Sequence, residues 1–212
     1  SGSGNTYTGT TTINTGTIII GATQSIGAIA GAGNLSLSTG TVTTNSSSST
    51  TFSGVISGTG NLTKAGTGTL TLSGNNTYSG VTTISAGTIE IGSAGRLGGG
   101  TYSSNISNSG ALIYSGTSAQ ALSGVISGTG NLTQNASSTL TLAGSNTYNG
   151  TTTLNAGQLN INNATAIGSG TLTINGGTID NTSVGTITLS NNNAQNWNGN
   201  FTFAGTNNLN LG

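Results

Sequence analysis

The strongest constraint on the fold of this chain is an internal repeat of about 70 residues. Eleven residues, SGVISGTGNLT, occur at positions 53–63 and again, unchanged, at positions 123–133. The match continues downstream of both copies, and a further partial copy opens the chain. In repeat architectures each unit buries its apolar face against the next unit. We therefore expect residues 1–212 to form one continuous stack, with repeat copies near 4–21, 52–92 and 122–162.

The repeat has the alternation of short β-strands. Thr69–Leu72 and Thr88–Ile91 alternate polar and apolar residues, which is the period of a strand with one buried face. Glycine, asparagine and serine interrupt these runs at short intervals. Threonine, isoleucine and valine favour strands, and no segment shows a helical period. The sequence therefore predicts an all-β fold.

Two all-β architectures fit such strands, a sandwich of hairpins and a solenoid of stacked coils. Asn-Gly and Asp-Gly pairs, which favour tight hairpins, are scarce, whereas low charge and small corner residues favour a solenoid. We predict a single-stranded, right-handed parallel β-helix with about 23 residues per coil, or three coils per repeat. The residues expected to point inward are Leu70, Leu72, Ile84, Ile89, Ile91, Leu140, Leu142, Leu154, Leu159 and Ile161.

The near absence of titratable side chains argues against an enzyme. The 212 residues include two basic and two acidic side chains and no histidine or cysteine. General acid–base catalysis, activated nucleophiles and metal sites all need such groups close together. We expect no catalytic, cofactor-binding or metal-binding residue. A net charge of zero predicts no nucleic-acid partner, and the longest β-branched run, Ile18–Ile20, is too short to insert into a membrane.

One stretch carries a family resemblance. Gly58–Gly74 reads GTGNLTKAGTGTLTLSG, and Asn76–Gly80 reads NTYSG. These residues resemble the autotransporter-associated β-strand repeat, also called the passenger-associated transport repeat; the second copy departs at Gln134–Ser138. The resemblance implies a β-helical passenger exported across a Gram-negative outer membrane to the cell surface. Because the chain begins inside a repeat, we expect it to be a segment of a longer protein.

Three groups of residues invite a functional interpretation. Asn-Thr-Tyr-x-Gly recurs at 5–9, 76–80 and 146–150; it can be an aromatic platform for glycans, but a corner whose tyrosine keeps its hydroxyl in water is favoured. Trp197, Phe201 and Phe203 are predicted to lie in the core or at a coil junction. The charged residues differ between copies, so Lys64, Glu90 and Arg96 are predicted to serve solubility.

Several functions remain compatible with this sequence. The leading one is a cell-surface β-helical passenger or stalk that is adhesive or self-associating. The alternative is a subunit or segment of an extracellular filament or sheath, whose coil ends stack head to tail. A glycan- or ice-binding solenoid is a minor alternative, because Thr-x-Thr pairs occur but are expected on several faces and not on one. The expected partners are flanking repeats of the same chain and other copies of it, lateral or head to tail.

Overall fold

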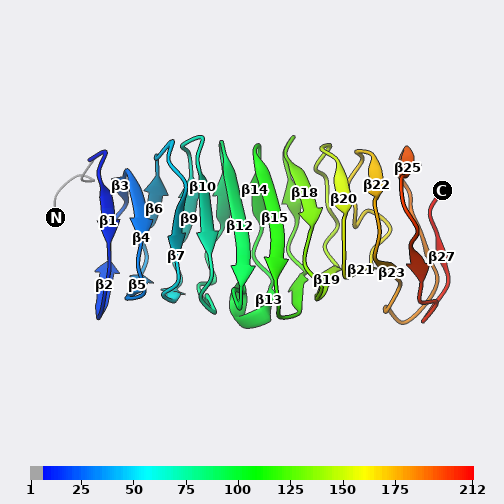
Figure 1. Ribbon diagram of the computed structural model, residues 1–212, viewed down its shortest axis with the longest axis horizontal. Helices are drawn as coiled ribbons and strands as arrows, with labels where there is room; N and C mark the ends of the chain where they lie inside the picture. Colours follow the sequence, from blue (N-terminus) through cyan, green and yellow to red (C-terminus); the bar gives the residue numbers. More distant parts are fainter. Residues whose placement is uncertain (1–6) are drawn as a thin grey trace.

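The computed structural model describes residues 7–212, which form a solenoid of parallel β-strands (Figure 1). The coils lie side by side along the long axis of the molecule, from the first strand to the last. Every strand pairing among the described residues is parallel, and the one helical segment described is a 3₁₀ turn at Gly98–Gly100. The predicted all-β solenoid is confirmed, and the hairpin sandwich is excluded.

Each full coil passes through three faces in the same order: back, front and lower. We name the sheets by their places in Figure 1. The front sheet contains eight strands, and the pair β1 (Thr10–Thr12) and β4 (Ala28–Ala30) precedes it on the same face. Its strands are β7 (Thr50–Phe52), β10 (Thr69–Leu72), β12 (Thr88–Ser93), β15 (Ala111–Gly116), β18 (Asn131–Gln134), β20 (Thr152–Leu154), β22 (Leu172–Ile174) and β25 (Gln195–Trp197).

The back sheet contains six strands: β3 (Gln24–Ile26), β6 (Thr41–Thr44), β9 (Asn61–Lys64), β11 (Thr82–Ile84), β14 (Ile106–Asn108) and β17 (Ile126–Ser127). The pair β24 (Ile187–Thr188) and β27 (Leu209–Asn210) occupies the corresponding part of the last coils. The lower face carries two sheets, β2 (Thr17–Ile20), β5 (Asn34–Leu37) and β8 (Ile56–Gly58), then β13 (Thr101–Tyr102), β16 (Gln120–Leu122), β19 (Thr139–Leu142), β21 (Gln158–Ile161), β23 (Thr178–Asp180) and β26 (Thr202–Phe203).

Most coils are shorter than the predicted 23 residues. In the regular part of the front sheet, Leu112 pairs with Leu132 and Leu132 pairs with Thr152, so one coil takes 20 residues. A longer coil joins Thr82 to its partner Ile106, because it contains the glycine-rich excursion at Gly98–Gly100. The predicted coil length was wrong because it divided the repeat into a whole number of coils.

The repeat does not contain a whole number of coils. Strand β9 lies in the back sheet, whereas its counterpart β18, 70 residues later, lies in the front sheet. In the same way, β10 in the front sheet corresponds to β19 on the lower face. The second copy is therefore shifted onto the next face of the solenoid relative to the first. This shift is possible because a strand with its corner needs only one side that faces the core and a paired strand in each of the two neighbouring coils.

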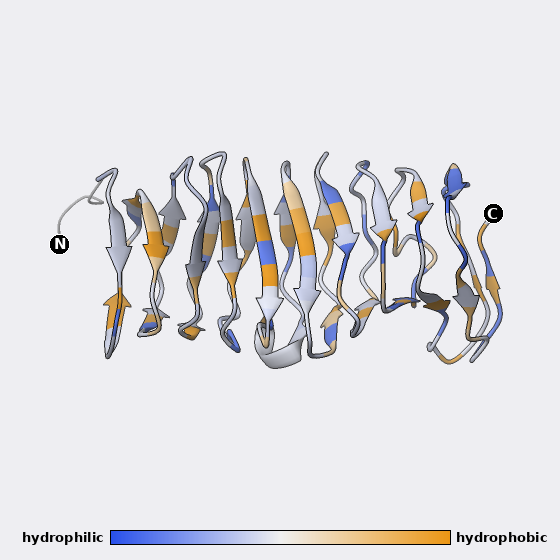
Figure 2. Ribbon diagram, viewed as in Figure 1, coloured by the Kyte–Doolittle hydropathy of each residue, from blue (hydrophilic) through white to orange (hydrophobic). Residues whose placement is uncertain are grey.

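A thin apolar core runs along the axis. All ten residues predicted to point inward are at most 2% exposed, which confirms the alternation read from the sequence. Orange, hydrophobic bands recur from coil to coil among pale and blue segments of the ribbon (Figure 2). The inward residues of successive coils stack in register, such as Leu70 on Ile89 and Leu140 on Leu159. Burial of these side chains supplies the main favourable free energy of folding.

Glycines stack at the tightest corners. A Cβ placed on Gly80 would lie 2.0 Å from the carbonyl oxygen of Gly60, and one on Gly60 would lie 2.1 Å from that of Gly40. Such distances are far inside van der Waals contact. The column from Gly40 through Gly60 to Gly80 therefore admits no side chain, which explains why the repeat keeps glycine at these positions.

The inward assignment predicts a sharp contrast between two substitutions. Leu72→Asp places an unpaired charge at a fully buried position and should lower the free energy of unfolding by about 4 kcal/mol or more, the upper end of single-substitution effects. Glu90→Gln changes an outward side chain that accepts a hydrogen bond from Thr71 Oγ1 at 3.4 Å, and should stay within about 0.5 kcal/mol of the wild type. Chemical denaturation followed by circular dichroism measures both, and the opposite ranking would contradict the assignment.

Candidate functional surface

The repeated tyrosine motif forms a buried hydroxyl pair. The hydroxyl of Tyr78 hydrogen-bonds to Thr82 Oγ1 at 2.6 Å, and that of Tyr148 bonds to Thr152 Oγ1 at 2.5 Å. Both tyrosines are fully buried, and burial raises the pKa of each phenol above its usual value. The prediction that these hydroxyls face water was wrong, because a threonine four residues later supplies the partner inside. The corner interpretation of the motif holds, whereas a glycan platform needs an exposed ring.

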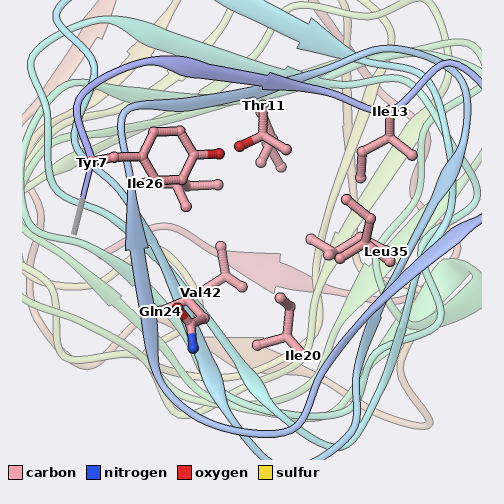
Figure 3. Close-up of a pocket in the computed structure, with 10 residues that line it drawn as sticks. Tyr7, Thr11, Ile13, Ile20, Gln24, Ile26, Leu35 and Val42 are labelled. Carbon is pink, nitrogen blue, oxygen red and sulfur yellow. The ribbon is translucent and has the colours of Figure 1, made fainter. Parts of the chain in front are cut away.

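The first copy of the motif differs. Asn5 and Thr6 lie outside the described residues, and Tyr7 is 39% exposed. Tyr7 and Thr11 line a mostly apolar cavity of about 170 Å³ at the first coils, together with the residues labelled in Figure 3. The hydroxyl of Tyr7 is directed toward that of Thr11 (Figure 3). This cavity is part of the solenoid interior at the first described coils, and none of its lining residues is charged.

The asparagine of the same motif ties neighbouring coils together. Asn76 Oδ1 accepts a hydrogen bond from the backbone N–H of Ile56 at 2.9 Å, and its Nδ2 donates to the carbonyl of Arg96 at 3.1 Å. Asn146 repeats this arrangement between Ile126 and Ala166. One side chain thus satisfies backbone groups of the coil before it and the coil after it, so these residues are structural.

Lys64 does not contribute to solubility as predicted, because it is buried. Its side chain is 2% exposed, faces the core between Thr44 and Ile84, and its Nζ donates to the carbonyl of Gly66. Burial lowers the pKa of this amine below its usual value. Gln134, the counterpart of Lys64 in the next copy, is buried as well. The prediction failed because the two copies use different polar side chains at the same inward position.

Asp180 is also structural. The carboxylate is 2% exposed and accepts hydrogen bonds from the N–H of Thr206 at 3.0 Å, from its hydroxyl at 2.6 Å and from the N–H of Asn181 at 2.8 Å. Burial alone would raise the pKa of this carboxyl, but the hydrogen bonds outweigh burial and hold the pKa below its usual value. Asp180 therefore pins the last coil and is not placed for proton transfer.

The aromatic cluster is more exposed than predicted. Trp197 occupies an inward register position beside Ile174, yet it is 61% exposed, and Phe203 is 45% exposed. Trp197 and Phe201 meet edge to face with ring centroids 5.3 Å apart. These residues belong to the final coil described, which has a neighbour on one side only. Trp197 and Phe203 stand at inward register positions, so the core prediction was right about register and wrong about burial.

An ordered polar ladder runs along the outside. At one corner, Asn155 donates to Asn135 Oδ1 at 3.3 Å, Asn175 donates to Asn155 at 2.7 Å and Asn198 donates to Asn175 at 3.0 Å. An asparagine ladder therefore lines this corner. No group of three or more His, Cys, Asp or Glu side chains able to hold a metal occurs within residues 7–212. The same residues contain no helix with the length and apolar character needed to cross a bilayer.

These features define the class: a parallel β-solenoid of stacked coils with ladders of uncharged polar side chains on its surface. The passenger-associated transport repeat matches residues 1–20, 62–91 and 132–161 of this chain, which confirms the resemblance read from the sequence. The Adhesin BmaC autotransporter of Brucella suis biovar 1 (strain 1330) is 38% identical over 222 residues. That match covers 75% of this chain and 6% of the relative. No solved structure matches.

The burial of Lys64 and the backbone hydrogen bonds at Arg96 predict resistance to trypsin. The side chain of Lys64 cannot reach a protease pocket, and the carbonyl of Arg96 accepts hydrogen bonds from Asn76 while Leu97 is buried. We expect the folded chain to remain intact under conditions that cut the urea-unfolded chain after both residues. Mass spectrometry of the digest checks this, and rapid cleavage of the folded chain after Lys64 would contradict its burial.

The buried tyrosines predict loss of stability at alkaline pH. Because their pKa values are raised in the folded state, the unfolded chain loses phenolic protons first, so stability is fully present below about pH 10 and falls as pH rises further. Tyr148→Phe removes one such group and should make this decline shallower. At pH 7 the same variant should lose about 1–3 kcal/mol, because the polar group of Thr152 loses a buried partner.

Denaturant titrations at pH 7, 9 and 11 measure both effects. Tyr7→Phe is the matched control, because Tyr7 is partly exposed. Equal alkaline slopes for the wild type and Tyr148→Phe would contradict the assigned role of the buried phenol.

Proposed function

We propose that this chain is part of an extracellular β-helical passenger that reaches the bacterial surface, and that its role there is adhesive rather than enzymatic. The observation that carries the proposal is the outer surface itself. Uncharged hydroxyl and amide side chains repeat along the rod in register with the strands, and the charged groups Lys64 and Asp180 are buried in structural contacts. A surface of this kind can make many weak, similar contacts along its length.

The relative and the repeat family support the same proposal. The relative is called an adhesin and an autotransporter, and the repeat is named for passenger transport. The chain spans 6% of the length of that relative. An adhesive role for the whole protein to which this chain belongs is therefore a separate proposal. A stacked solenoid suits such a role, because each coil adds contact surface at a fixed spacing.

Adhesion can be tested with the purified chain on beads. Beads that carry the folded chain should attach to mammalian epithelial cells, or to each other, more strongly than albumin-coated beads. Beads that carry Leu72→Asp should not, since this variant keeps the composition and loses the ordered ladders. Flow cytometry and bead-clumping counts provide the measurements. If folded-chain beads attach to nothing and do not clump, the chain is a passive spacer and the proposal is wrong.

A further inference from the structure

One unbroken column of hydroxyl side chains crosses the back sheet. At the central outward position of each of its six strands stands a serine or a threonine. In β6, β9, β11 and β14 the flanking residues are buried, such as Leu62 and Lys64 in β9, so the residue between them points outward. All six column residues are half-buried. The strand register places them side by side: Ser25, Thr43, Thr63, Thr83, Ser107 and Ser127. We call this set the back hydroxyl column.

Five of these six hydroxyls have no hydrogen-bond partner among residues 7–212. Ser25 Oγ accepts a hydrogen bond from Asn45 Nδ2 at 2.5 Å. Within residues 7–212, the hydroxyls of the other five make no side-chain hydrogen bond. Each can donate one hydrogen bond and accept two. The column therefore offers a straight row of donors and acceptors on a rigid sheet.

Within residues 7–212 the hydroxyl rows of the other faces are shorter, and the front sheet has three in succession at Thr133, Thr153 and Thr173. On the front sheet, Glu90 and Ile113 stand between Thr71 and Thr133 at the equivalent outward position. On the lower face, Thr141 is followed by Asn160 and then by Asp180, which is buried under Thr206. The back sheet also has no outward charge, because its one charged residue, Lys64, points into the core.

The period of the column selects its partner. Successive hydroxyls repeat at the spacing of parallel strands, roughly 4.7–4.9 Å. A ligand whose repeat differs by about 0.5 Å drifts by about 2.5 Å over five steps, nearly the length of a hydrogen bond. A second solenoid of the same sequence has the same step and stays in register along the whole column. Identical surfaces often repel through like charges, but here no outward charge opposes the approach.

We propose that the back hydroxyl column is a lateral self-association surface that receives the same column of a second copy of this chain. The two solenoids lie side by side with their axes aligned, and the hydroxyls of one bond to those of the other. Each contact is weak, so association strengthens with the number of aligned strands and changes little between low salt and molar NaCl. This inference rests on the proposed adhesive function and names the surface through which one copy adheres to another.

Disulfide trapping tests the surface directly, because the chain contains no cysteine. Thr63→Cys and Thr83→Cys place thiols in the column, and Thr153→Cys is the matched control, since Thr153 is half-buried at the same kind of outward position on β20. During mild oxidation, at least one of Thr63→Cys, Thr83→Cys or their mixture should form dimers about tenfold faster than Thr153→Cys. A disulfide between two Thr63→Cys chains indicates parallel axes. A disulfide between a Thr63→Cys chain and a Thr83→Cys chain indicates antiparallel axes. Equal rates on both sheets would overturn the proposal.

Charge substitution provides the second arm. Thr63→Lys and Thr63→Glu should each be monomeric in low salt by light scattering at concentrations where the wild type associates, and an equimolar mixture should associate again. Thr153→Lys should behave as the wild type does. Association of Thr63→Lys alone, or no recovery in the mixture, counts against the column. A wild-type chain that stays monomeric while its beads attach to cells overturns this inference alone; association without attachment to cells or clumping of beads overturns the adhesive function alone.

Discussion

Parallel stacking of each coil on the one before it is the constraint from which the other properties follow. Backbone hydrogen bonds join every coil to its neighbours, so each position along the coil lies directly above a corresponding position of the previous one. Inward positions must then fill a narrow channel, and corners must let backbone pass over backbone. Leucine and isoleucine meet the first requirement, and the glycine column at Gly40, Gly60 and Gly80 meets the second.

Polar groups inside this channel also follow from stacking. A thin core leaves backbone groups at the corners without strand partners, and buried groups of this kind need hydrogen bonds. Asn76 and Asn146 satisfy them from the side chain, and the pairs Tyr78–Thr82 and Tyr148–Thr152 bury two hydroxyls against each other. The motif that looks like a candidate ligand site in sequence is therefore a structural part of the corner.

Alternation and repetition predicted the fold class and the ten inward residues, because both are local properties of a strand with one buried side. The coil length could not be obtained in that way, since three equivalent faces accept the same local sequence and nothing in the repeat marks a complete turn. Burial of Lys64 was missed because variation between copies resembles surface variation. The exposure of Trp197 depends on a neighbouring coil and not on its own sequence.

The back hydroxyl column could not be read from the repeat for a related reason. Thr63 and Thr83 occupy different positions within one repeat, yet the 20-residue coil places them side by side. Thr133, which corresponds to Thr63 in the next copy, lies on the front sheet, in line with Ile113. Because the repeat and the coil have different lengths, the surface of such a solenoid does not copy its sequence period. A nearly uniform repeat can thus give one face an unbroken row of hydroxyls and another face a mixed surface, and specific contact becomes possible without any residue that distinguishes one repeat from the next.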